Sequence, residues 1–250
     1  MQRLNLHHTP AKGSVQGSIL PIQGTWCQSS IWTKYWTKWL AEVGYQSWVM
    51  DYPVEGTTSI SNQVDLTHQV INQIENEFGV SLSLFGHSRG GAVAQKVASE
   101  RDLASIVLLG SSAPWPICNI RWPLVSEFWR YLPQILSSRL FRPSNAVLDR
   151  LEFHRFPNGE ELMADLIPDS GRTSLEILLS LTKVDHLRCD ALIVAGQYDR
   201  IMPVGIQKAL HEKYGRRADY LERPHGHMPM LEENSGSTLR EIVDWLNIWA

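Results

Sequence analysis

The chain has 250 residues, of which 43% are hydrophobic and 20% are charged. This length can bury one large core, and a formal net charge of -3 excludes a strongly basic nucleic-acid-binding protein. No apolar run is long enough to span a bilayer, and the first residues lack the apolar block of a secretory signal, so we expect a cytoplasmic protein.

Short apolar segments alternate with longer helical patterns through the first half of the chain. The segment at residues 18–22 is an imperfect strand because it contains a proline. His7 and His8 precede it and are expected to belong to a mobile terminus. The alternation of buried strands and helices predicts an α/β fold, with a mostly parallel sheet and helices on both of its faces. The predicted strands cover residues 18–22, 46–50, 80–85 and 104–109, and the predicted helices cover residues 31–40, 64–78 and 90–98.

The pattern changes at Pro114-Trp115-Pro116. From there to about Asp185 the sequence is helical and contains no predicted strand. Strands return at residues 191–195 and 218–221, and a last helix follows at 237–249. An insertion of about 70 residues is too long for an ordinary loop. We therefore predict an α/β core made of residues 1–114 and 186–250, interrupted by a helical lid or cap at residues 115–185.

A sharp turn separates the strand that ends at Phe85 from the helix that begins near Gly90. Its sequence is Gly86-His87-Ser88-Arg89-Gly90. A tight strand-to-helix turn needs small residues two before and two after its apex, and it exposes the hydroxyl at the apex. Gly-x-Ser-x-Gly alone is a weak signal, but between a strand and a helix it predicts that Ser88 is a nucleophile.

A serine hydroxyl needs a base to remove its proton and a carboxylate to orient that base. Asp199 follows directly on the strand at 191–195, which puts it at the same edge of the sheet as Ser88. After the last strand come two histidines, His225 and His227, and either could be the base.

With these segments the chain resembles the α/β-hydrolase fold superfamily over nearly its whole length. Its triads run in the order serine, aspartate, histidine along the chain. The resemblance implies that His227 rather than His225 is the base, and that Asp199 is the orienting carboxylate rather than Asp185, Asp190 or Glu222. The segments that carry the resemblance are Gln23-Gly24-Thr25-Trp26, Asp51-Tyr52-Pro53-Val54-Glu55-Gly56, Gly86 to Gly90, Asp199-Arg200-Ile201-Met202-Pro203 and Gly226-His227-Met228-Pro229.

The oxyanion of a tetrahedral intermediate needs preorganised N–H donors. One donor is expected to be the backbone N–H of Arg89, next to the nucleophile. The resemblance implies that the second is the backbone N–H of Thr25. The family usually has a histidine before the glycine of this loop, whereas this chain has Gln23, so the geometry of the loop is an open question.

Aromatic residues suggest an apolar substrate pocket. Trp26 and three tryptophans of the insertion, Trp115, Trp122 and Trp129, are its candidates, although such residues more often pack a lid onto a core. The insertion also has an excess of arginines, which could receive an anionic acyl carrier protein or coenzyme A thioester, or could be a solvated helix face. These arginines are Arg121, Arg130, Arg139, Arg142, Arg150 and Arg155.

No cofactor and no metal is predicted, because the sequence has no phosphate-binding loop and no metal-ligand cluster. Cys27, Cys118 and Cys189 form no disulfide framework. His87 is interpreted as a packing residue, and Asp51 as the anchor of a turn. Cys27, near the oxyanion loop, is interpreted as a half-buried thiol.

The function that these observations favour is a serine hydrolase that cleaves the carboxylic ester or thioester of a small, largely apolar acyl group through an acyl-enzyme. The same fold and triad also serve C–C hydrolases, cofactor-free haloperoxidases and lyases. A third hypothesis is a catalytically silent ligand-binding protein, although no triad residue is missing. A haloalkane dehalogenase is disfavoured because it would need an aspartate in place of Ser88.

Overall fold

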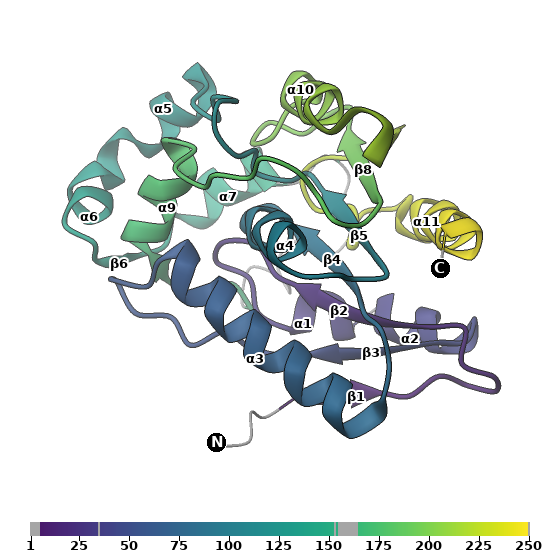
Figure 1. Cartoon of the computed structure of the whole chain (residues 1–250). Helices are drawn as coiled ribbons and strands as arrows, with labels where there is room; N and C mark the ends of the chain where they lie inside the picture. The colour runs from purple at the N-terminus through teal and green to yellow at the C-terminus, as the bar shows by residue number, and fades with distance from the viewer. Residues whose placement is uncertain (1–5, 35, 153, 155–164, 250) are drawn as a thin grey trace.

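The computed structural model describes residues 6–34, 36–152, 154 and 165–249. Seven of the described strands form one sheet in the order β1-β3-β2-β4-β5-β8-β9 (Figure 1). β1 runs antiparallel to β3, and the other pairs are parallel. The strands are β1 (His7–Thr9), β2 (Gly17–Ile22), β3 (Tyr45–Val49), β4 (Ser83–His87), β5 (Ser105–Leu109), β8 (Ala191–Gly196) and β9 (Ala218–Arg223).

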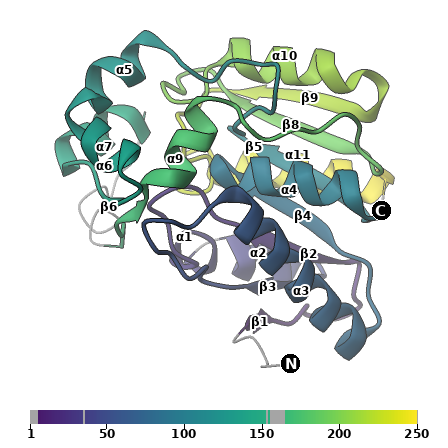
Figure 2. The ribbon, with the colours of Figure 1, turned by 60° about the vertical axis from the view of Figure 1, so that its left-hand side comes forward.

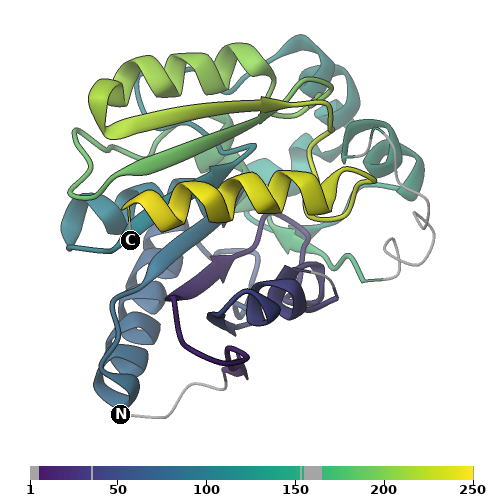
Figure 3. The ribbon, with the colours of Figure 1, turned by 90° about the vertical axis from the view of Figure 1, so that its right-hand side faces the viewer.

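Helices cover both faces of the sheet. α3 and α4 lie on one face, and α2 and α11 lie on the other (Figures 1 and 3). Every residue of β3, β4, β5 and β8 is buried, as expected of parallel strands between two helical layers. The predicted α/β fold is therefore confirmed. The helices of this part are α1 (Ser30–Thr33), α2 (Trp36–Glu42), α3 (Ile60–Phe78), α4 (Arg89–Glu100), α10 (Val204–Tyr214), the 3-10 turn η2 (Gly215–Arg217) and α11 (Ser235–Trp249).

The boundaries of α3 follow directly from local sequence signals. Ser59 caps its first turn by accepting a hydrogen bond from the N–H of Asn62, whose side chain in turn accepts one from the N–H of Ser59. At the other end Gly79 adopts the left-handed conformation, with φ of 64°, which a residue without a Cβ adopts at little cost.

Several elements differ from the sequence-based expectation. His7 and His8 belong to the edge strand β1, and the His8 ring stacks on Trp48 with 4.5 Å between ring centroids. The expectation of a mobile terminus was therefore wrong, because an aromatic contact outside the local pattern fixes this strand. The helix expected at residues 31–40 is divided into α1 and α2, and α10 was not predicted.

Most regular elements between β5 and β8 are short helices, as expected, but the described residues there also contain two short strands that pair with each other. Strands of two residues carry no alternating pattern, so they could not be predicted. Figure 2 shows these helices gathered beyond one end of the sheet. The elements are α5 (Trp122–Phe128), the 3-10 turn η1 (Trp129–Tyr131), α6 (Leu132–Leu136), β6 (Leu140–Phe141), α7 (Asn145–Glu152), β7 (Asp169–Ser170) and α9 (Gly171–Leu178).

The order of the strands creates a place for a site. β2 is followed in the chain by β3 on one side of it, whereas β4 lies on its other side. In a parallel sheet the loops after two such strands diverge and leave a crevice at their carboxyl ends. Ile22 pairs with Gly86 at this point, so the turn at Ser88 and the loop at Thr25 lie next to each other.

Among the described residues, no helix is long and apolar enough to cross a bilayer.

Candidate active site

Ser88 occupies a strained turn between β4 and α4. Its φ and ψ are 51° and -116°, a conformation that non-glycine residues rarely adopt and that is typical of functional sites. The turn is possible because its two glycines leave room for neighbouring backbone. A Cβ on Gly86 would lie 2.7 Å from the carbonyl oxygen of Gly90, and a Cβ on Gly90 would collide with the carbonyl oxygen of Ile22.

His227 and Asp199 are in direct contact. The Nδ1 atom of His227 lies 2.8 Å from Oδ2 of Asp199, and the two residues are 1% and 5% exposed. The other carboxylate oxygen, Oδ1, accepts hydrogen bonds from the N–H groups of Ile201 at 2.8 Å and Met202 at 2.7 Å. Because the carboxylate only accepts, Nδ1 is the protonated nitrogen and Nε2 is left with its lone pair.

The electrostatics of this pair favour the ionised carboxylate. Burial alone would raise the pKa of Asp199, but the adjacent His227 and the two backbone donors lower it overall. For His227, burial alone would lower the pKa, but the charges of Asp199, Glu152 and Glu232 raise it above 6.5. The imidazole is therefore a stronger base than an isolated histidine.

Ser88 and His227 line the same cavity. Within the described part of the chain no hydrogen bond joins the Ser88 hydroxyl to the imidazole, a contact that often tightens only when substrate is bound. The structure thus brings the three predicted residues to one rim of the sheet, with the Asp199–His227 contact formed and Ser88 beside it.

The other two histidines of this region have different partners. His225 turns its Nδ1 atom to the carbonyl oxygen of Gly226 at 2.8 Å, and Asp199 forms its hydrogen bonds with His227, Ile201 and Met202 instead. His87 donates from Nε2 to the carbonyl oxygen of His227 at 2.9 Å, and the two rings lie 4.8 Å apart. Burial, together with the charge on His227, lowers the pKa of His87 to about 3, so His87 is a neutral support for the His227 backbone.

The alternatives to Asp199 lie elsewhere. Asp190 pairs with Arg217 at 3.3 Å, and Glu222 pairs with Lys208 at 3.3 Å. Asp185 is exposed.

The loop that carries Thr25 is anchored on both sides. From the core, the buried Gln23 side chain donates from Nε2 to the carbonyl oxygen of Met50 at 2.9 Å. From β7, the Asp169 carboxylate accepts the N–H of Trp26 at 2.9 Å. Trp26 has a φ of 63°, so these contacts hold a turn that the residue would otherwise avoid. The N–H groups of Thr25 and Arg89 donate to no acceptor among the described residues.

Asp169 has a second partner. Its Oδ2 atom also accepts a hydrogen bond from Nη1 of Arg89, and both side chains are 2% exposed. Arg89 stands in the turn beside Ser88, so one carboxylate links the Ser88 turn, the Thr25 loop and β7. The sequence pattern pointed only to the backbone N–H of Arg89 and did not indicate a role for Asp169. One signal could have pointed to it. Arg89 lies between Ser88 and Gly90 in a turn that must be buried, and a buried arginine needs an acidic partner.

The cavity beside Ser88 is lined mainly by apolar side chains, and its volume is about 60 Å³. Trp26 lines it, as proposed from the sequence, and stacks on Phe128 with 5.6 Å between centroids. Glu152 lines it too and was not recognised from the sequence. The apolar lining residues are Trp26, Leu124, Phe128, Ile135, Phe141, Ile177, Leu178, Ile201 and Met202.

Three tryptophans expected in the pocket do not line it. Trp115, Trp122 and Trp129 are 60%, 78% and 57% exposed. Residues three and four apart share one face of a helix, and the inward face of α5 is formed by Leu124 and Phe128. The same periodicity turns Trp122 to the outside, which composition alone does not reveal.

The remaining residues have structural roles. Asp51 accepts hydrogen bonds from the N–H of Ser29 at 2.6 Å and from its hydroxyl at 3.0 Å, so it anchors a loop, as predicted. Burial raises the pKa of the Cys27 thiol well above its usual value, which keeps it un-ionised.

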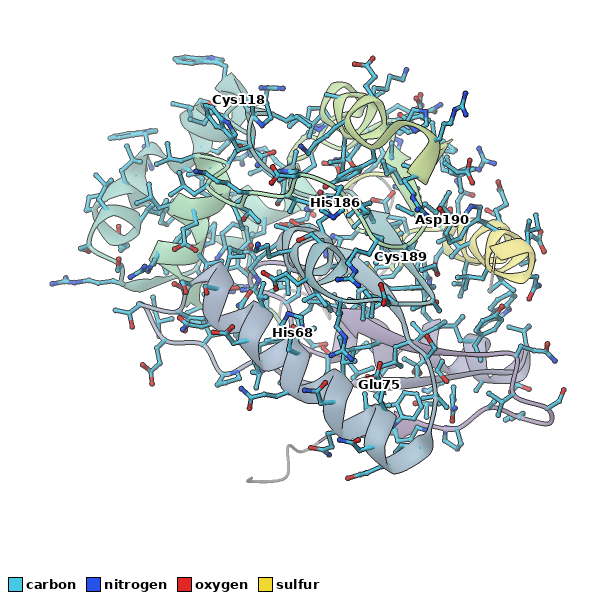
Figure 4. All side chains as sticks on the ribbon, in the orientation of Figure 1. His68, Glu75, Cys118, His186, Cys189 and Asp190 are labelled. Carbon is cyan, nitrogen blue, oxygen red and sulfur yellow. The ribbon has the colours of Figure 1, made fainter. Side chains whose placement is uncertain are left out.

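The cysteines are free, and Figure 4 shows Cys118 well apart from Cys189. No group of histidine, cysteine and acidic residues in the described chain could hold a metal ion.

Comparisons with known proteins agree with this architecture. The model of the alpha/beta hydrolase family matches residues 20–238, whereas no curated protein matches. The fold is similar to a monoacylglycerol lipase from Paleococcus ferrophilus, with a TM-score of 0.73 and 18% identity over 100% of both chains. An esterase from Exiguobacterium antarcticum is also similar, with a TM-score of 0.70 and 18% identity over 96% of this chain and 94% of that one.

A third similar structure is a mutant of CumD, a meta-cleavage product hydrolase. Its TM-score is 0.68, and its identity is 17% over 97% of this chain and 94% of that one. At these identities the likeness concerns the fold, and the proteins named catalyse different reactions.

Proposed function

The chain belongs to the alpha/beta hydrolase family, and from this premise we propose that it is a serine hydrolase that cleaves the carboxylic ester or thioester of a small, largely apolar acyl group. The observation that carries the proposal is the 2.8 Å contact between His227 and Asp199, beside a serine in a strained turn. A buried carboxylate that orients an imidazole is what activation of a serine hydroxyl requires.

Each step uses groups with the required chemistry. Nε2 of His227 takes the proton of Ser88 as Oγ attacks the substrate carbonyl, and the negative charge moves to the carbonyl oxygen. The N–H groups of Thr25 and Arg89 donate to this oxyanion. His227 then gives the proton to the leaving alcohol or thiol, which leaves an acyl-enzyme. A water molecule attacks this intermediate by the same route and releases the acid and the free Ser88.

The inserted segment, residues 115–185, is proposed to be a lid over a core made of residues 1–114 and 186–250. Leu124, Phe128 and Ile135 from the segment line the cavity together with Ser88. A volume of about 60 Å³ is well below that of pockets for drug-sized ligands, which favours a short acyl group. Apolar walls also exclude water from the oxyanion and strengthen the interactions that stabilise it.

A narrower proposal concerns a thioester carried by coenzyme A or an acyl carrier protein. Of the arginines that suggested it, Arg150 pairs with Glu127 at 2.7 Å, and Arg155 lies outside the described residues. Arg130 and Arg139 are exposed and would meet an anionic partner. The double variant R130Q/R139Q should lower kcat/KM for the carrier-bound thioester and leave p-nitrophenyl ester turnover unchanged. Equal kcat/KM values of wild type and R130Q/R139Q for the thioester would refute the proposal of a carrier-bound substrate.

The decisive test is a Ser88→Ala variant assayed with short p-nitrophenyl esters, alongside fluorophosphonate labelling of the unaltered protein. Removing the nucleophile of a triad lowers kcat by about 10⁶-fold, while circular dichroism should show an unchanged fold. A matched Ser112→Ala variant, which alters a buried serine after β5, should keep its turnover and its labelling. Full activity of S88A would exclude the proposal.

Labelling also separates the alternative reactions. A C–C hydrolase, a haloperoxidase or a lyase on the same fold is favoured if the esters are not turned over and the fluorophosphonate does not label Ser88. A silent binding protein is favoured if a small molecule raises Tm and is recovered unchanged.

A further inference from the structure

Glu152 lines the same cavity as Ser88 and His227. Glu152 is the last residue of α7 and is only 4% exposed. Its Oε2 atom has no hydrogen-bond partner among the described residues. The side chain therefore leaves one carboxyl oxygen buried and unsatisfied at the wall of the cavity.

The backbone of Glu152 is fixed to the loop that carries His227. The N–H of His227 donates to the carbonyl oxygen of Glu152 at 3.0 Å. Oε1 of Glu232 accepts from the N–H of Gly226 at 2.8 Å and from the N–H of His154 at 3.1 Å, which joins this loop to the chain after α7. The position of Glu152 beside the imidazole is thus determined without any bond to Oε2.

No neighbouring cation among the described residues offsets the cost of burying the Glu152 carboxyl group. The charged groups that act on it most are His227 and Asp199, which already pair with each other, and no lysine or arginine among the described residues forms an ion pair with it. Burial raises the pKa of Glu152 to about 7. A buried polar group without a partner destabilises the free protein, and a ligand that supplies a donor removes this cost.

We propose that Glu152 is a substrate-recognition residue that binds a hydroxyl or amino group on the part of the ester that enters this cavity. A carboxyl oxygen accepts from either donor, and an ammonium group adds charge pairing. A site that binds a polar substrate group strongly rejects the analogue that lacks it, because its own polar atom then stays unpaired. The proposal rests on the proposed function only for the identification of the ligand as an ester.

The variant Glu152→Leu distinguishes recognition from a structural role. If the carboxyl group supported the fold, its removal would lower Tm. Because Oε2 is buried without a partner beside a mainly apolar cavity, we expect instead that E152L has an unchanged or higher Tm, as is common when a functional polar group is replaced by an apolar one. A clear decrease in Tm would assign Glu152 to the fold and overturn its proposed role.

Selectivity is measured with three p-nitrophenyl esters: butanoate, 3-hydroxybutanoate and 3-aminobutanoate. The quantity compared is the ratio of kcat/KM for each substituted ester to that for butanoate, so a general loss of activity cancels. Wild type should prefer at least one substituted ester, and E152L should lower that ratio roughly tenfold or more. E152Q, whose amide oxygen still accepts, should keep most of a hydroxyl preference and lose an ammonium preference. The matched control is Glu127→Gln, a surface carboxylate of the same segment that pairs with Arg150.

A binding measurement keeps this test independent of catalysis. In the S88A background, calorimetric Kd values for ethyl butanoate and ethyl 3-hydroxybutanoate or 3-aminobutanoate should show the same preference, and S88A/E152L should lose it. Equal ratios with and without Glu152 would overturn the recognition role. If Ser88 is not labelled but the binding preference depends on Glu152, the hydrolase proposal fails and the recognition site stands.

Discussion

The buried carboxyl groups at the carboxyl edge of the sheet and on the inserted segment differ in their hydrogen bonding and in the direction of their pKa shifts. At the sheet edge, both oxygens of Asp199 are bonded, and its pKa is lowered. On the inserted segment, Oε2 of Glu152 is unpaired among the described residues, and burial raises its pKa. This difference is expected if Asp199 must hold its charge during a reaction, which requires preorganised donors, and if Glu152 instead receives its donor from a ligand.

Asp169 qualifies this contrast, because it belongs to the inserted segment but is bonded as completely as Asp199. It accepts from Arg89 and Trp26, and its Oδ1 accepts from the N–H of Ser170. The segment thus supports the core at one point and leaves a free acceptor at another.

The largest effect is expected from Asp199→Asn, which tests the preorganised side of the comparison. The amide would favour the wrong imidazole tautomer, and kcat should fall by about 10⁴-fold. Steady-state kinetics on a p-nitrophenyl ester measure this. Asp190→Asn, which alters only a surface pair with Arg217, is the control. Similar kinetics for the two variants would remove Asp199 from the triad.

Asp169→Asn tests whether the segment supports the chemistry. The buried Arg89 would lose its counter-charge, which costs about 3–5 kcal/mol in the free energy of unfolding. The Trp26 N–H would lose its charged acceptor and the Thr25 loop its anchor, so kcat should fall by about 10²–10³-fold, as for a lost oxyanion donor.

Urea unfolding and kcat measure the two effects of D169N. Arg172→Gln, which breaks an exposed pair with Glu176, should change neither. Loss of stability without loss of kcat in the folded D169N protein would limit Asp169 to the fold.

The pH dependence of activity tests the electrostatics of the sheet edge. His227 acts as a base only when it is neutral, and its pKa is raised above 6.5. As pH falls through this pKa the imidazole is protonated, so kcat/KM should fall about tenfold per pH unit, with a midpoint above 6.5. In D199N the midpoint should move to lower pH. A wild-type midpoint below that of free histidine would contradict the pairing.

Gln23→Ala examines the core-side anchor of the Thr25 loop. Its loss leaves the buried carbonyl of Met50 without this donor and should lower the free energy of unfolding by about 1–3 kcal/mol. Because Asp169 still holds Trp26, kcat should fall less than in D169N. Thermal unfolding and steady-state kinetics on the same preparations show which variant, Q23A or D169N, loses more kcat. A larger kcat loss in Q23A would show that the core, and not the segment, positions the loop.

The smallest effect is expected from Trp122→Gln. The side chain is 78% exposed, so unfolding free energy should change by less than about 0.5 kcal/mol and turnover of small esters should be unchanged. Phe128 lies on the inward face of α5 together with Leu124. Phe128→Ala should therefore lower the free energy of unfolding by about 3–5 kcal/mol. Equal effects of the two substitutions would mean that the exposed and the lining faces are not distinct.

Much of the fold could be predicted because its signals are local. Short apolar segments that alternate with helical patterns predicted the parallel strands, and Gly79 predicted the end of α3. Ser88 could be recognised because its turn needs glycines at fixed positions. β1 could not be predicted, because its stability depends on the contact between His8 and Trp48, which are far apart in the sequence.

Local sequence signals were enough to predict the turn at Ser88 and the alternation of strands and helices, because each depends on residues close together in the chain. They also placed Ser88 and Asp199 at the same edge of the sheet, because both follow parallel strands. Local signals could not show that Asp199 bonds to His227, that Asp169 meets Arg89, or that Glu152 lines the cavity while Trp122 is exposed. These facts depend on the packing of segments distant in the sequence and on the rotation of each helix about its axis, and a linear pattern specifies neither.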